Sequence, residues 1–115
     1  MEYSSAHRLA ADIRASEEYQ TYHTLREEVM GDETVAALIR EYKKLQVSLQ
    51  MAAMSGQTPD SEDMQRFQQL ASLLYMNSDV QAYLMAEMQM QKTLADIFKI
   101  LTEAAGIRFD VPDKQ

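Results

Sequence analysis

The chain has 115 residues, 46% of them hydrophobic and 25% charged, and its 18 acidic and 11 basic residues give a net charge of −7. This length and hydrophobic content predict one folded domain and argue against intrinsic disorder. A negative chain without clustered basic residues is not expected to bind nucleic acid directly. The absence of cysteine excludes disulfides, thiol nucleophiles and cysteine-held metals or clusters.

No targeting or membrane segment is predicted. The N-terminus lacks the basic segment and continuous apolar core of a signal peptide. No apolar run approaches the roughly 20 residues that are needed to cross a bilayer. We therefore expect a soluble, cytoplasmic protein without membrane contact. The three glycines and two prolines fall near predicted helix ends, so the expected fold class is all-α.

The first two predicted helices are short and amphipathic. The first covers residues 2–15, with apolar side chains at steps of three and four residues from Tyr3 to Ile13. Ser16 is suited to cap a second helix, whose first turn is acidic and therefore matches the positive end of the helix dipole. Gly31 ends this second helix.

Two further helices follow. Asp32 is expected to cap a long third helix over residues 33–54, which Gly56 ends. Pro59 opens a fourth helix, because proline suits the first helical position, and Asn77 closes it. The acidic residues after Pro59 are interpreted as a helix cap and not a calcium loop, because the glycine and distal glutamate of an EF-hand are missing.

The longest helical pattern covers residues 79–105, with Ser78 as its N-cap and Gly106 placed for a left-handed C-terminal turn. At 1.5 Å per residue it would be about 42 Å long, which exceeds the roughly 35 Å diameter of a compact chain of this size. Its apolar face is also wide enough to require neighbours on two sides. Residues 106–115 form a tail that is expected either to dock as an extended strap or to fray.

These features predict a five-helix bundle in a single domain, residues 1–105, that assembles as an intertwined or side-by-side homodimer. The alternative is a monomeric bundle with frayed ends. The dimer or partner interface is expected on the fifth helix, with the third helix beside it. Its predicted residues are Val80, Leu84, Met88, Leu94, Ile97, Phe98 and Leu101.

Three polar residues interrupt the apolar faces of the long helices: Gln46 in the third, and Glu87 and Gln91 in the fifth. A polar side chain on such a face costs stability unless it is paired. One interpretation is a polar core cluster that fixes register and partner choice, as a buried asparagine does in coiled coils. The other is that these long side chains reach the edge of the face or a water-filled seam.

No enzyme, metal or cofactor site is predicted. No second acid, base or nucleophile lies at a defined spacing from Glu87, so a catalytic role for it has no support. His7 and His23 lie on different predicted helices, outside any zincin or di-iron pattern. The methionines of the long helices are interpreted as core or interface residues, with an adaptable binding groove as the alternative.

Four spaced patterns follow one another along the helices. They are A-x-x-L-A-x-x-I-x-x-S-E-E-Y at Ala6–Tyr19, Y-x-x-L-Q-x-x-L-Q at Tyr42–Gln50, M-x-G-x-x-x-x-x-E-x-M at Met54–Met64 and Y-L-x-A-E-x-x-M-x-x-x-L-x-D-I at Tyr83–Ile97. In order and spacing they resemble the YlbF/YmcA family of small helical bacterial proteins, and especially its short YheA-like branch.

The resemblance implies a dimer-forming, all-α, non-enzymatic regulator from Gram-positive bacteria. The family's best-known members form a complex with each other and a third protein, affect competence, sporulation and biofilm formation, and act with the endoribonuclease RNase Y in mRNA processing. Their iron–sulfur cluster depends on cysteines, so it does not carry over to this chain.

From the residues and the resemblance together we expect a regulatory adaptor that acts through protein–protein contacts. Its expected partners are a second copy of itself, family paralogues or an RNA-processing enzyme. The alternative is a structural or chaperone-like dimerisation module without a dedicated regulatory partner.

Overall fold

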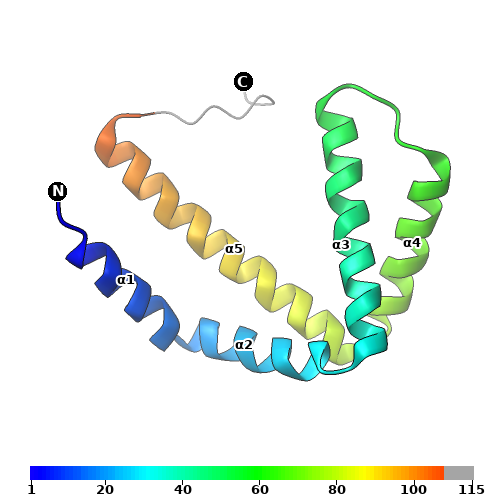
Figure 1. Cartoon of the computed structure of the whole chain (residues 1–115), viewed down its shortest axis with the longest axis horizontal. Coiled ribbons are helices and arrows are strands. Elements are labelled where there is room, and N and C mark those ends of the chain that lie inside the picture. The colour runs from blue at the N-terminus through cyan, green and yellow to red at the C-terminus, as the bar shows by residue number, and fades with distance from the viewer. Residues whose placement is uncertain (108–115) are drawn as a thin grey trace.

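The computed structural model describes residues 1–107, and within this range the chain forms five helices (Figure 1). They are α1 (Ser4–Ala15), α2 (Glu17–Met30), α3 (Glu33–Met54), α4 (Ser61–Tyr75) and α5 (Ser78–Ala105). The all-α class is confirmed, and the two long helices have their predicted bounds to within one residue. The tail beyond Ile107, which was expected to dock or fray, lies outside the described residues.

Several helix ends follow the predicted local chemistry. The Ser16 hydroxyl accepts a hydrogen bond from the backbone N–H of Tyr19, and the Asp32 carboxylate accepts from the first turn of α3. Such caps satisfy backbone donors that have no partner inside the helix. Gly106 adopts φ 70°, a left-handed conformation that glycine tolerates without a steric penalty, and thereby ends α5 as predicted.

Two helix starts differ from prediction. The side chain of Asn77, not Ser78, caps α5, because its amide oxygen accepts from the N–H groups of the first turn. The fourth helix begins after Pro59, with Asp60 as its N-cap. In both cases an amide or carboxylate oxygen of the residue next to the predicted start is well placed to reach the free N–H groups of the first turn. The interpretation of the acidic residues near Pro59 as a cap is confirmed for Asp60.

The helices form an open V with two arms (Figure 1). One arm consists of α5 with α2 packed along its first half, and α1 runs beside the second half without packing on it. The antiparallel pair α3 and α4 forms the other arm. The chain measures 48 × 37 × 17 Å, so it is a thin plate of helices. Its radius of gyration of 17.4 Å exceeds the roughly 13 Å of a compact chain of this length.

The hydrophobic core lies at the apex of the V, where the two arms meet. Its buried residues come from four helices and are Val29, Ile39, Tyr42, Leu70, Leu74, Val80, Tyr83 and Leu84. Val80 and Leu84 were predicted to face a second copy, but helices of the same chain cover them. This part of the prediction is corrected, since a buried side chain is not available to a partner.

The two arms separate beyond the apex. The third helix was expected beside the fifth, and this holds only near the apex, because the backbones of α3 and α5 then diverge (Figure 1). No residue of Ser4–Ala15 is buried, although helices this short are marginal in water without packing. The second half of α5 also leaves Leu94, Ile100 and Leu101 exposed. The outer end of this arm therefore has apolar surface that the other helices of the described range do not cover.

Two adjacent leucines of α4 test the position of the core. Leu74 is 2% exposed and Leu73 is 52% exposed. We expect Leu74→Ala to lower the free energy of unfolding by about 2–5 kcal/mol, because it removes buried methyl groups and leaves a cavity. Leu73→Ala should change it by less than about 1 kcal/mol. Urea unfolding of both variants checks this, and equal losses would place the core elsewhere.

Candidate functional site: the apex ion pair and the mouth of the V

A polar network joins the two arms at the apex. Lys43 of α3 places its Nζ 2.5 Å from Glu87 Oε2 of α5 and 3.3 Å from the hydroxyl oxygen of Tyr83. The Tyr83 hydroxyl donates to the same Glu87 oxygen at 3.5 Å. The ammonium also lies 5.3 Å from the centre of the Tyr83 ring, within range of a cation–π attraction. One cation from one arm thus binds two residues of the other.

The local fold places these groups. Tyr83 and Glu87 are four residues apart on α5 and therefore lie on the same side of the helix. Tyr22 of α2 stacks on Tyr83 with ring centres 5.9 Å apart, which holds the phenol against the ion pair. The two charged side chains are only partly accessible, with 35% of Lys43 and 18% of Glu87 exposed.

The environment shifts two pKa values in this network. Burial acts most strongly on the pKa of Lys43 and lowers it, but the hydrogen bonds to Glu87 and Tyr83 and the charge of Glu87 together outweigh it. The net pKa of Lys43 therefore lies above its ordinary value. Burial, followed by the proximity of Tyr83 and Glu87, raises the pKa of Tyr22. Both shifts favour a protonated, positively charged Lys43 and a neutral Tyr22.

The predicted polar cluster of Gln46, Glu87 and Gln91 is not assembled. Glu87 is partly buried and paired, but Gln46 and Gln91 are exposed on their separate helices. Sequence reasoning missed Lys43, which is the partner that Glu87 needs. The third helix carries three cations and the fifth carries four anions, so the sequence offers several possible pairs, and only the crossing of the two helices selects Lys43 with Glu87.

Beyond the ion pair and Lys44, the inner faces of α3 and α5 carry no ionisable side chain. Steps of four, seven and eleven residues follow one side of a helix. From Lys43 they reach Val47, Gln50 and Met54 on α3. From Glu87 the same steps reach Gln91, Leu94 and Phe98 on α5. We call these two inner faces the mouth of the V.

The charges of the outer half of α5 lie on the opposite side of the helix. Lys92, Asp96, Lys99 and Glu103 follow one another at steps of four, three and four residues. Lys92 and Asp96 form an exposed ion pair at 3.1 Å. This half of α5 is therefore amphipathic, with a charged outer face and an uncharged face toward the mouth.

The remaining predicted interface residues lie on this outer half or just before it. Met88, Leu94, Phe98 and Leu101 are exposed, and Ile97 is partly buried. These residues are the part of the predicted interface that is still accessible to a partner.

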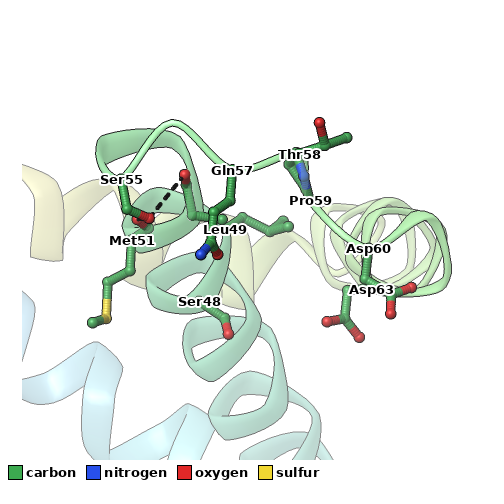
Figure 2. Close-up of a pocket in the computed structure, with 10 residues that line it drawn as sticks. Ser48, Leu49, Met51, Ser55, Gln57, Thr58, Pro59, Asp60 and Asp63 are labelled. Carbon is green, nitrogen blue, oxygen red and sulfur yellow. Dashed lines mark hydrogen bonds between the residues drawn. The ribbon is translucent and has the colours of Figure 1, made fainter.

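A shallow pocket of about 540 Å³ lies between the end of α3, the connecting loop and the start of α4 (Figure 2). Its polar groups largely serve the fold. The Ser55 hydroxyl donates to the backbone oxygen of Met51, and the Asp60 carboxylate caps α4. Figure 2 also shows the Met51 side chain pointing away from α4, toward the other arm. The pocket does not combine groups that would carry a reaction.

Neither histidine is part of a cluster of metal-ligating groups. His23 stacks on Tyr19 and pairs with Glu27 at 3.4 Å on the exposed side of α2. Within residues 1–107 no three His, Asp or Glu side chains come together in a way that could hold a metal ion. No helix in this range is long and apolar enough to span a bilayer.

An elongated five-helix fold with a partly buried ion pair between two arms defines a class of small helical proteins. A family model described as control of competence regulator ComK, YlbF/YmcA, matches residues 3–105. The chain belongs to this YlbF/YmcA family, as its sequence patterns indicated.

Relatives with a similar length support this assignment. A UPF0342 protein of Halothermothrix orenii is 35% identical over 86% of this chain and 84% of its own length. One from Caldicellulosiruptor saccharolyticus is 33% identical over 92% of this chain and 88% of its own. A solved structure, a protein of unknown function (DUF964) from Bacillus stearothermophilus, matches with a TM-score of 0.71 and 25% identity, over 90% of this chain and 91% of that one.

The ion pair at the apex can be measured by a double-mutant cycle with Lys43→Met and Glu87→Leu. We expect each single variant to lose about 1–3 kcal/mol of unfolding free energy, because it leaves the other partner partly buried without its ion pair. The double variant should recover part of that loss. The same cycle on the exposed pair, with Lys92→Met and Asp96→Leu, should give a coupling of only about 0.3–0.5 kcal/mol. Equal couplings for the two pairs would contradict the role of the apex pair.

Proposed function

We propose that this protein is a non-enzymatic regulatory adaptor that forms a homodimer and acts through protein–protein contacts. The observation that carries the proposal is the open V, because α1 and the outer half of α5 present apolar side chains that are exposed in the described part of the chain. Membership of a family described as a competence regulator supports a regulatory role.

The surface area also supports an assembly. The chain exposes 8999 Å², whereas a compact monomer of 13.2 kDa would expose about 6,400 Å². Each partner contributes roughly 800 Å² to a protein–protein interface of ordinary size, which is about a third of the difference between these two areas. A thin plate of helices therefore has enough surface to form such an interface without refolding.

The proposed partners follow from the family resemblance. They are family paralogues or an RNA-processing enzyme such as RNase Y, bound by the homodimer. The lack of cysteine means that any complex with them forms without an iron–sulfur cluster held by this chain. The alternative function is a structural or chaperone-like dimerisation module, which the unusually large exposed apolar surface also favours.

Affinity capture from a Gram-positive host, followed by mass spectrometry, separates these two functions. For the adaptor we expect stoichiometric recovery of a defined partner, such as an RNA-processing endoribonuclease, and its reconstitution from purified components. Recovery of only the protein itself, or of assorted unfolded proteins, would favour the dimerisation module. Capture with the Leu94→Asp variant described next shows whether partner binding requires the homodimer.

The homodimer can be tested with matched variants on two sides of α5. We expect Leu94→Asp to shift the chain from dimer to monomer, because a charge on an interface would be buried without a partner. Leu94 is 51% exposed within one chain, so the fold itself should survive the change. Met85→Asp, at a similarly exposed position on the charged outer side, should remain dimeric. Sedimentation equilibrium distinguishes the two, and a monomeric wild type at micromolar concentration would refute the homodimer.

A further inference from the structure

We propose that the homodimer is a clasp, in which the outer half of α5 from one copy occupies the mouth of the V of the other. This inference rests on the proposed homodimer and adds where and how the copies meet. Its core is the α3 stripe, defined as Val47, Met51 and Met54, which would contact Leu94 and Leu101 of the second copy's α5.

The α3 stripe is positioned to receive a helix. Val47, Met51 and Met54 are all exposed, at 53%, 64% and 61% respectively. They follow one another at steps of four and three residues and therefore share one side of α3. Figure 2 shows that Met51 points away from α4, toward the other arm. Because α3 and α5 diverge from the apex, the α5 of the same chain does not cover this stripe. Helix α3 therefore has an apolar side with no neighbour among residues 1–107.

The chemistry of the mouth selects an apolar occupant. The side chains along the mouth beyond the apex cannot form ion pairs. They are Val47, Gln50 and Met54 on α3, and Gln91 and Leu94 on α5. The nearest charges are those of Lys43 and Glu87, which neutralise each other at the apex, and that of Lys44, which lies one turn before Val47. Beyond Lys44, a charged segment entering the mouth would lose hydration without gaining a counter-charge from α3. The occupant must therefore present uncharged, largely aliphatic side chains.

A second copy meets this requirement. Leu94 and Leu101 of α5 lie on its uncharged side and remain exposed, whereas Lys92, Asp96, Lys99 and Glu103 point to the other side. In a two-fold arrangement the α3 stripe of each copy contacts the α5 of the other. One symmetric interface would then cover the α3 stripes and the outer α5 faces of both chains at once. The charged faces of both α5 helices would stay in water.

The first test compares Val47→Glu with Leu73→Glu. The two side chains are equally exposed, at 53% and 52%, but Leu73 lies on α4, outside the mouth. We expect Val47→Glu to weaken dimerisation at least tenfold in sedimentation equilibrium, with an unchanged helical circular dichroism spectrum. Leu73→Glu should dimerise as the wild type does. If Val47→Glu leaves the dimer constant unchanged while Leu94→Asp dissociates it, the clasp is wrong and the homodimer stands.

The second test uses the natural absence of cysteine and does not depend on a destabilising change. Two sets of separately tagged single-cysteine variants are mixed and mildly oxidised. One set has its cysteine in the α3 stripe, as Met51→Cys or Met54→Cys. The other set has its cysteine on α5, as Leu94→Cys or Leu101→Cys. We expect mixed disulfide dimers for at least one pairing, several-fold above the yield with Met85→Cys, which lies on the outer side of α5. Mixed-dimer yields no higher than this control for every pairing would overturn the clasp. A wild type that sediments as a monomer would instead overturn the homodimer on which it rests.

Discussion

The arrangement of the chain depends on a small contact region at the apex of the V. There, eight buried residues and the Lys43–Glu87–Tyr83 network connect two arms that separate on either side of it. Apolar packing holds the two arms together. The ion pair favours one orientation of the arms, because a charge-assisted hydrogen bond weakens when its geometry changes. The angle between the arms is therefore controlled by few side chains, and the same angle determines the width of the mouth.

A structure only 17 Å thick also limits what one chain can bury. In so thin a plate of helices, most side chains have solvent on one side of the plate or the other, so a core forms only where helices cross. This explains why α1 contains no buried residue although its sequence is amphipathic. It also gives a physical reason for the proposed assembly, since a second layer would cover surface that additional helices cover in larger domains.

The YlbF/YmcA family membership applies to the fold as a whole. The matched region extends over residues 3–105, so it includes both arms and not just one helical hairpin. Within the described residues, the polar groups with defined geometry serve helix caps, surface ion pairs and the apex network. The exposed apolar side chains of both arms are the basis of the protein–protein contacts that we propose.

Local sequence determined the helices of this protein, and tertiary structure decided what their faces contact. Helix bounds followed from apolar periodicity and from capping residues such as Ser16 and Asp32, because those interactions lie within one turn of the chain. The stripe of α5 looked uniform, yet Leu84 is in the core and Leu94 is exposed. Periodicity reports which side of a helix is apolar, but not which neighbour covers it. For the same reason Glu87 was recognised as needing a partner, whereas Lys43 was identified only when α3 and α5 were placed in space.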